Sequence, residues 1–378
     1  MTGVTETGRP AGSAPGTGDP GRSGASVPVS VTRQRARPRG RVWLWAVALG
    51  AALVASVIAA VTIGPAGLAP ADVVASVAAH LGIGEPTLSP LRDGIVWELR
   101  MPRVLTAAAV GAGLALCGAV MQALTRNPLA DPYLLGLSSG ASVGAVIVIV
   151  LGVGLLLPVA AFAGALAALV ATLALAGAAG RGAGRSGGLS PTRTVLAGLA
   201  VSSMFGAITS LVIFWSATGD SYREILNWLL GSLAGTDWVS VTIAGGALVA
   251  IGIPLIASAR TLDAFAFGDA AASALGVHVG RSRVLLLGGT ALLTGALVAV
   301  SGSIGFIGLI LPHGVRLLVG SRHRALLPLS ALAGALFLVW ADTAARTLFD
   351  PRELPVGIIT ALVGGPVFAL LLMRRRVS

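Results

Sequence analysis

Histidine, cysteine and lysine, which carry much of enzyme and cofactor chemistry, are few or absent in this sequence. The four histidines, His80, His278, His313 and His323, show neither an HExxH motif nor any other metal-ligand spacing. The single cysteine, Cys117, lies in the middle of an apolar run, where packing is its ordinary role. The sequence contains no lysine, so a phosphate-binding loop of the form GxxxxGK(S/T) is impossible. We therefore expect a chain that is not an enzyme, that binds no metal or cofactor, and that relies on another chain for any ATP hydrolysis.

The carboxylates are placed at the ends of apolar runs. All 15 acidic residues fall in a terminal segment, in a connection or at the end of a run. A proton- or sodium-coupled carrier usually buries an ionisable group or unwound polar backbone near the bilayer midplane. This placement weakens the interpretation as an ion-coupled carrier without excluding it. The sequence has no nucleophile elbow and no paired carboxylates inside an apolar run, so a membrane-embedded enzyme lacks support from individual residues.

The composition indicates what must position these side chains. Hydrophobic residues make up 55% of the 378 residues and charged residues only 11%, whereas a soluble domain has about 25% charged residues. The formal net charge of +11 could indicate a nucleic-acid partner, but the arginines flank apolar runs, so we expect a lipid bilayer and no nucleic acid. Residues 1–40, rich in Gly, Pro, Ser and Thr, are expected to form a disordered basic cytoplasmic tail.

The apolar runs predict an all-α polytopic membrane protein with ten transmembrane helices, because about 20 apolar residues are needed to cross a bilayer. The predicted spans are 42–63, 103–124, 134–152, 157–179, 194–216, 238–258, 284–301, 303–318, 325–341 and 356–373. A short helix is expected at 71–81, a half-helix within 219–237, and a polar island at 260–283. With both termini in the cytoplasm, 20 of the 26 arginines fall inside, which is the expected positive-inside bias.

The stretch from Arg100 to Gly140, RMPRVLTAAAVGAGLALCGAVMQALTRNPLADPYLLGLSSG, is the most informative part of the chain. Small residues recur every four positions at Ala107, Gly111, Ala115 and Ala119, which predicts close approach of another helix. The stretch resembles the permease subunits of bacterial ABC importers for iron–siderophores, haem and vitamin B12, the FecCD-type permeases. Blocks at 302–335 and 353–368 resemble the same family, and the resemblance covers about residues 42–376.

The resemblance implies a type II ABC importer permease fold for residues 41–376 and a place in the bacterial cytoplasmic membrane. It also implies two cytoplasmic ATPase subunits that hold ATP and Mg, an extracytoplasmic substrate-binding (lipo)protein, and a second permease subunit. The cargo suggested first is an iron–siderophore complex, with vitamin B12 or haem as the alternative. Whether the permease pair is a homodimer or a heterodimer is left open.

The resemblance also implies site residues. Arginines matching Arg100, Arg103 and Arg346 contact the binding protein, and as exposed outer cations they would steer an acidic partner; the alternative, favoured for Arg103, is that they anchor helix ends. The segment 262–280 is implied to dock into the ATPase, through Leu262, Asp263, Phe267, Gly268, Asp269, Ser273, Leu275, Gly276 and Val277. Exposed Phe265, Phe267, Leu275 and Val277 would need an apolar partner, where a solvated loop is the alternative.

Two further sets of residues follow the transport path in the resemblance. The cytoplasmic gate is implied at two proline-containing turns, whose prolines would end helices sharply, against the alternative of ordinary loop punctuation. Its residues are Asn127, Leu129, Pro191 and Thr192. The pathway itself is expected along a two-fold axis between subunits, lined by Gln122, Trp228, Gly231, Ser232, Pro312 and His313. For His313, a structural role is the stronger alternative.

Overall fold

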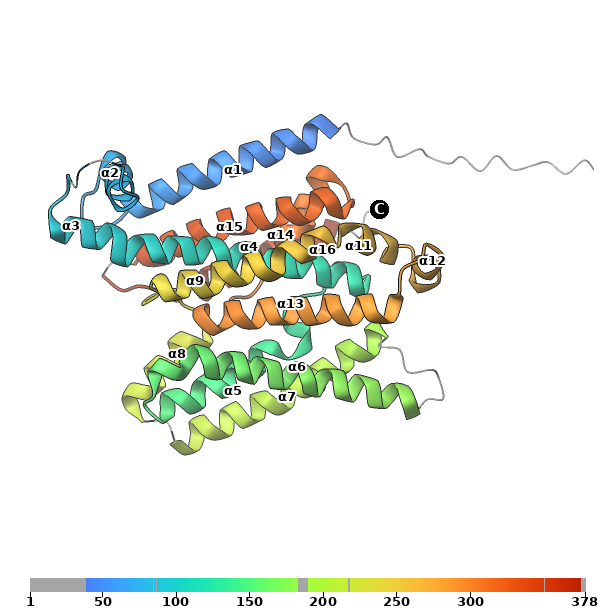
Figure 1. Cartoon of the computed structure of the whole chain (residues 1–378). Coiled ribbons are helices and arrows are strands. Elements are labelled where there is room, and N and C mark those ends of the chain that lie inside the picture. The colour runs from blue at the N-terminus through green and yellow to red at the C-terminus, as the bar shows by residue number, and fades with distance from the viewer. Residues whose placement is uncertain are drawn as a thin grey trace, which may run out of the picture. The chain divides into compact units, whose positions relative to one another are not determined.

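The computed structural model describes residues 39–83, 85, 87–182, 190–216, 218–349 and 351–374, and all regular structure within them is helical (Figure 1). The first half contains α1 (Arg39–Thr62), α2 (Pro70–His80), α3 (Pro90–Gly94), the π-helix η1 (Ile95–Arg100), α4 (Met101–Thr125), the 3₁₀ helix η2 (Pro132–Leu135), α5 (Leu137–Val150), the 3₁₀ helix η3 (Gly154–Leu156), α6 (Leu157–Gly182) and α7 (Pro191–Ser216). The second half contains α8 (Gly219–Leu229), α9 (Trp238–Ala247), the π-helix η4 (Leu248–Gly252), α10 (Ile253–Ala257), α11 (Ala259–Phe265), α12 (Asp269–Ala274), α13 (Val279–Ser301), α14 (Ile307–Val319), α15 (His323–Thr347) and α16 (Val356–Arg374).

Seven helices among the described residues are long and apolar enough to span a membrane. They are Val42–Thr62, Pro90–Thr125, Leu157–Ala179, Pro191–Ser216, Trp238–Ala257, Val279–Ser301 and His323–Thr347. Three further apolar helices are shorter: Leu137–Val150, Ile307–Val319 and Val356–Leu371. The prediction of an all-helical polytopic membrane protein is therefore confirmed. A 14-residue helix such as α5 rises only about 21 Å. The number of ten membrane crossings therefore stays a prediction.

Helix α4 is at the centre of the packing, and its small residues explain why. It contacts α15, α14, α13 and α9, and nearly all of its residues are buried. A Cβ on Gly111 would lie 2.2 Å from the carbonyl oxygen of Gly334 in α15, and one on Gly118 would lie 2.0 Å from that of Gly308 in α14. The close helix approach predicted from the four-residue spacing is thus confirmed at Gly111.

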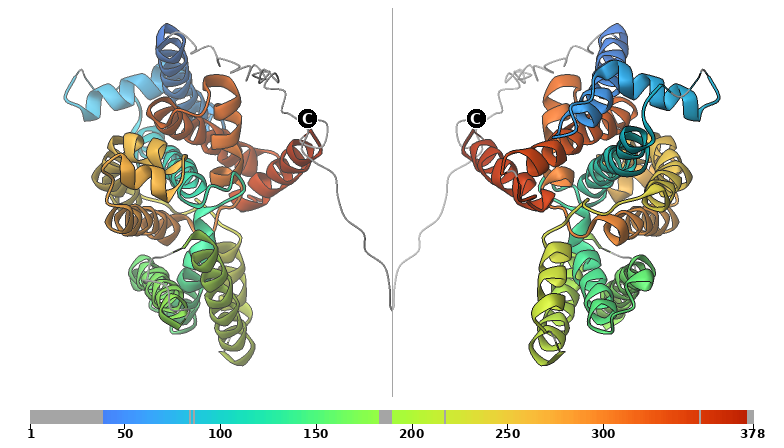
Figure 2. Two further views of the ribbon diagram at one scale, coloured as in Figure 1. Left: turned by 90° about the vertical axis from the view of Figure 1, so that its right-hand side faces the viewer. Right: turned by 90° about the vertical axis from the view of Figure 1, so that its left-hand side faces the viewer.

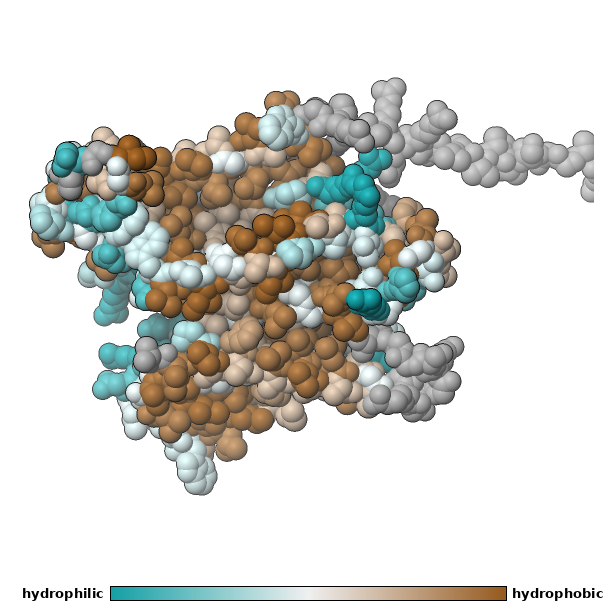
Figure 3. Space-filling model, in the orientation of Figure 1, coloured by the Kyte–Doolittle hydropathy of each residue, from teal (hydrophilic) through white to brown (hydrophobic). Residues whose placement is uncertain are grey.

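Helices α5, α6 and α7 pack on one another and join the rest mainly through α13. In the end-on views this group lies below the other helices (Figure 2). The contact is made by small residues, including Ala141, Ala145 and Ala165, against Val298 and Ala299 of α13. The surface of α7 stays strongly apolar, and the space-filling view shows a hydrophobic flank over this group (Figure 3). Such a flank suits lipid or a second membrane subunit.

Several predicted boundaries change. The second span begins at Pro90, because α3, η1 and α4 form one continuous helix, so Arg100 lies inside a helix and does not begin one. The eighth span, predicted from residue 303, begins later: the chain is non-helical up to Phe306, whose φ is +69°, and α14 then begins at Ile307. The short helix and the half-helix appear as α2 and α8. The predicted disordered tail lies outside the described residues, apart from residues 39 and 40, which begin α1.

Candidate functional site

Arg103 is the centre of an outer ion-pair cluster, which we define as Arg103, Asp342 and Glu353. Its Nε and Nη2 donate to the Asp342 carboxylate at 2.9–3.1 Å, and its Nη1 donates to Glu353 Oε2 at 2.7 Å. The Asp342 side chain is only 1% exposed and that of Arg103 12%. A bidentate, nearly dry pair of this kind joins α4 to α15. This geometry agrees with the anchoring alternative that the sequence favoured for Arg103.

Arg100 and Arg346 both reach the end of α1. Arg100 Nη1 donates to the carbonyl oxygens of Val61 and Thr62 at 2.8 and 3.2 Å, and Arg346 Nη2 donates to that of Ala60. These carbonyls have no partner further along the helix, and cations at a helix C-terminus are stabilising. Arg100 is 8% exposed and Arg346 is half-buried. The expectation that Arg100 is an exposed outer cation was wrong, because the α1 terminus occupies its guanidinium.

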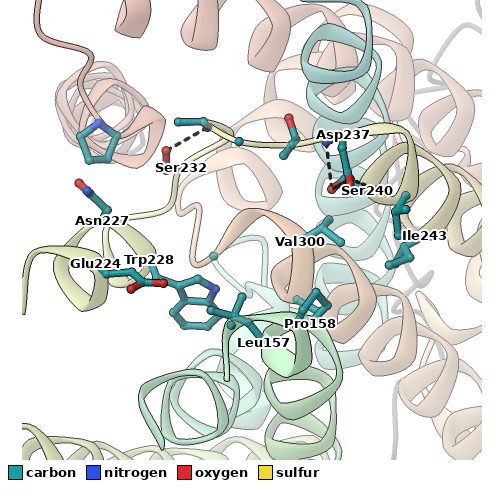
Figure 4. Close-up of a pocket in the computed structure, with 18 of the residues that line it drawn as sticks. Leu157, Pro158, Glu224, Asn227, Trp228, Ser232, Asp237, Ser240, Ile243 and Val300 are labelled. Carbon is teal, nitrogen blue, oxygen red and sulfur yellow. Dashed lines mark hydrogen bonds between the residues drawn. The ribbon is translucent and has the colours of Figure 1, made fainter. Parts of the chain in front are cut away.

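A cavity of about 640 Å³ lies between α8, the start of α9, the end of α13 and the residues before α16 (Figure 4). Trp228 and Ser232, both predicted to line the pathway, are in its wall. Gly231 directly precedes Ser232 and packs closely on the backbone of Ser303. Its φ is +76°, and a Cβ there would lie 2.4 Å from the carbonyl oxygen of Ser303. The half-helix predicted within 219–237 therefore supplies one side of a hollow.

Three carboxylates stand in the cavity wall, and the described wall residues include no arginine or histidine. They are Glu224, Asp237 and Glu353. Asp237 begins α9 by accepting from Ser240 N at 2.9 Å and Ser240 Oγ at 2.8 Å, and these bonds lower its pKa. Figure 4 shows Glu224 beside Trp228, and Asp237 across the hollow from them. Sequence reasoning missed this set, although the spacing of Asp237 and Ser240 is a capping signal.

Gln122, Pro312 and His313 lie away from this cavity. Gln122 is 3% exposed; its Nε2 donates to the carbonyl oxygens of Gly308 and Leu309, and its Oε1 accepts from Arg316. Gln122 therefore ties α4 to α14 with both polar atoms of its side chain, and its place on the pathway wall stays a prediction. Pro312 is buried inside α14, and the half-buried His313 follows it.

The first gate turn, residues 126–131, is stiff. It leaves α4 at Arg126 with φ of +51°, and Asn127 Oδ1 then accepts from Leu129 N at 3.0 Å. Leu129 is 41% exposed. Asp131 closes the turn by accepting from Tyr133 N at 2.9 Å, and burial raises the pKa of Asp131 to about 6. As the sequence predicted, a helix ends sharply here, since α4 stops at Thr125, and the role of this turn as a gate stays a prediction.

The second gate turn differs from its prediction. Pro191 does not end a helix; it is the first residue of α7, and Thr192 follows it within the helix. Proline suits that position, since the first helical N–H has no partner in any case. The carbonyl of Ser190 accepts from Thr194 N at 3.0 Å and so begins the helix. Residues 183–189, which precede this point, lie outside the description.

The segment 262–280 folds as two short helices, α11 and α12, with a turn between them. Phe267 and Leu275 are 79% and 69% exposed, as expected for a docking surface. Phe265 was expected to be exposed and is buried, since it packs in the core under the Arg283 guanidinium, 5.3 Å from its ring centroid. Val277 is half-buried, and Leu262 is fully buried.

Ion pairs hold this segment to neighbouring helices. Asp269 accepts from both terminal nitrogens of Arg283 at 2.7 and 3.0 Å, and this bonding lowers the pKa of Asp269. Asp263 lies 2.7 Å from His323 Nδ1 and accepts from the His323 backbone at 3.0 Å. The Asp269 carboxylate is therefore committed to Arg283 and not to a helix cap. Gly268 is the residue that precedes α12, while Ser273 lies near the end of α12 and Gly276 follows it.

This helical architecture, with its membrane-length helices and polar helix ends, is that of a polytopic membrane protein. The family model of the FecCD transport family matches residues 52–374, and the chain belongs to that family. It is 41% identical over 372 residues to the cobalamin import system permease BtuC of Halobacterium salinarum, covering 89% of this chain and 98% of that protein. It is also 41% identical to the hemin transport system permease HmuU of Yersinia pestis, covering 74% and 84% of the two chains.

A solved structure has the same fold. A metal-chelate type ABC transporter in an inward-facing conformation matches with a TM-score of 0.74 and 32% identity, covering 87% of this chain and 98% of that one. The protein is therefore a permease of an ABC transporter, a non-catalytic multi-pass component of the cytoplasmic membrane. The resemblance drawn from the Arg100–Gly140 stretch is confirmed.

Proposed function

We propose that this chain is the permease subunit of an ABC importer that carries an iron–siderophore complex. The working assembly in this proposal has two permease subunits, two cytoplasmic ATPase subunits and an extracytoplasmic binding protein. The permease would cross the membrane ten times with both termini in the cytoplasm. Membership of the FecCD transport family over residues 52–374 is the observation that carries the proposal. The arginine distribution supports the orientation.

In this orientation the 640 Å³ cavity opens towards the outside, since Glu224, Asp237 and Glu353 all belong to predicted outer connections. We propose that it forms part of the wall of the outer end of the pathway. Its volume is within the range of small-ligand pockets. A wall whose described residues include three carboxylates and no basic side chain disfavours an anionic cargo by Coulomb repulsion, although Glu353 shares its charge with Arg103. This charge pattern supports an iron chelate that is neutral or cationic.

Cobalamin or haem import is the second proposal, and the relatives support it. The permeases that are 41% identical to this chain are named for cobalamin in one case and for hemin in the other. Identity at this level does not separate the two cargoes from each other. The carboxylates of the cavity wall count against haem, whose two propionates are anionic near pH 7, and they leave cobalamin as the stronger alternative.

Arg100, Arg103 and Arg346 remain the proposed docking residues for the binding protein, with a condition that the geometry adds. To reach an acidic partner, Arg100 would have to release the α1 carbonyls it now holds. Arg346 is half-buried and is therefore better placed than Arg100 to contact an acidic partner. The double change Arg100→Glu with Arg346→Glu is expected to weaken binding-protein affinity. Unchanged affinity in that double variant would remove both arginines from the docking surface.

The test of cargo is uptake into proteoliposomes that hold this chain, its ATPase and its binding protein. The probes are a radioactive ferric hydroxamate siderophore, an anionic ferric catecholate siderophore, cobalamin and haemin. Accumulation of the hydroxamate chelate alone is expected. Accumulation of cobalamin alone would replace the cargo and keep the transporter class, and accumulation of the anionic catecholate would refute the charge argument. Glu224→Gln with Asp237→Asn is the matched variant, expected to relax discrimination against the anionic chelate.

A further inference from the structure

One carboxylate of the segment 262–280 is held by a buried cation. Asp269, at the start of α12, is held by Arg283 of α13 in a bidentate pair with distances of 2.7 and 3.0 Å. The Arg283 side chain is 7% exposed, and it also stacks over Phe265 of α11. Arg283 therefore binds both short helices of the segment 262–280 to the start of α13. A guanidinium is suited to this because it can form a planar bidentate pair and stack on a ring at once.

The second cation is Arg126, which belongs to the gate turn. A Cβ on Gly268, the residue before Asp269, would lie 3.3 Å from Arg126 Nη1. The positive charge of Arg126 also contributes to lowering the pKa of Asp269, after the larger effect of Arg283. Arg126 is the residue where α4 ends with φ of +51°, directly before Asn127. Arg126 of the gate turn therefore lies against Gly268 of the segment 262–280, next to the oppositely charged Asp269 in the sequence.

Hydrogen bonds and ion pairs hold both sides of this contact in place, so the contact can transmit a displacement from the segment to the turn. The segment is held on α13 by Arg283 and on α15 through Asp263 and His323, at 2.7 Å. The gate turn is held by the Asn127–Leu129 bond. Packed elements of this kind move as bodies and shift between discrete arrangements, so a displacement at one is passed on to its neighbour.

We propose that Arg283 and Arg126 are positioning residues through which movement of the segment 262–280 is passed to the gate turn, Arg283 through its pair with Asp269 and Arg126 through its place against Gly268. Arg283 keeps the segment rigid, and Arg126 links it to the turn. The proposal rests on the proposed function, in which an ATPase subunit docks on this segment. It assigns a role to two arginines that the sequence pattern did not single out.

A spin label on the exposed Leu129 tests the proposal without any cargo. Leu129→Cys can be labelled selectively, since Cys117 is fully buried. The assembled transporter is trapped with ATP and vanadate, and the change in label mobility is compared with the nucleotide-free state. The parent should respond. Arg126→Gln should keep ATPase binding and hydrolysis while its response at Leu129 falls at least about twofold, the lower end for loss of a coupling contact.

Two more variants separate coupling from docking and folding. Arg126→Lys keeps the positive charge beside the segment and should restore most of the response, and it leaves the buried Arg283 in place. Arg281→Ala is the matched control, because Arg281 is exposed on the first turn of α13 and should respond as the parent does. A full response in Arg126→Gln, or loss of ATPase binding in that variant, would overturn the inference. A parent chain that fails to bind the ATPase would instead refute the proposed function as well.

Discussion

Removing Arg103 from the outer ion-pair cluster should be among the most costly single changes at the outer end of the protein. In Arg103→Met the side chain keeps much of its length but loses all contacts to Asp342, which is 1% exposed. Breaking a buried ion pair by removing one partner costs about 3–5 kcal/mol, because the remaining charge is left without compensation. We expect a loss of this size in the free energy of unfolding.

Two further variants show whether burial is the cause. In Arg103→Met with Asp342→Leu no buried charge is left, so most of the stability should return. Glu353→Gln removes a partner whose side chain is 49% exposed, and such pairs contribute only about 0–1 kcal/mol. Asp342→Leu alone and Arg103→Met with Glu353→Gln complete two double-mutant cycles, in which Arg103 and Asp342 should show a large coupling energy and Arg103 and Glu353 a small one.

The assay is reversible unfolding of the detergent-solubilised permease by a denaturing detergent, followed by tryptophan fluorescence. The reasoning would be refuted by an Arg103→Met variant that loses less than about 1 kcal/mol, since that is the size for an exposed pair. It would also be refuted by a double variant no more stable than the single one. Either result would mean that water reaches Asp342.

Three other changes test the packing, the gate turn and a helix start. Gly118→Leu should prevent correct folding, because a Cβ there would lie 2.0 Å from Gly308, whereas Gly177→Leu meets nothing within 4 Å and should be tolerated; monodispersity on size exclusion separates them. Asp131 has a pKa raised to about 6, so its contribution to stability is full below about pH 4 and is lost as the pH rises through 6. Unfolding midpoints should fall in the parent between about pH 4 and 6 and stay level in Asp131→Asn. Asp237→Ala removes the α9 cap and should cost about 1 kcal/mol; no change in the unfolding midpoint would show that this cap is redundant.

Patterns local in sequence predicted the elements well. The half-helix that became α8 was visible because 219–237 is too short to cross and is polar at both ends. The four-residue spacing of small residues identified the face of α4 that meets α15 at Gly111. Proline was harder to interpret: Pro191 marks a helix start and Pro312 lies inside a helix, and only the flanking backbone distinguishes those roles.

Side-chain partners far apart in the chain could not be predicted. Arg103 and Asp342 are 239 residues apart, and no local pattern pairs them. Phe265 looked exposed in a polar island because its partner, Arg283, lies on another helix. Arg100 looked free for a partner protein because the end of α1 that binds it lies almost 40 residues earlier. In each case the contact depends on how the helices pack. The family resemblance implied a role for these residues but not the geometry of their contacts.

The source of energy for uptake tests the central claim most directly. Proteoliposomes holding the chain, its ATPase and its binding protein would be given the radioactive ferric hydroxamate and cobalamin, with either ATP inside or an imposed proton gradient. An ABC importer permease predicts accumulation of one probe that requires internal ATP, requires the ATPase, and continues when the gradient is collapsed. Uptake that is driven by the gradient and persists without the ATPase would contradict the account and make the chain an ion-coupled carrier.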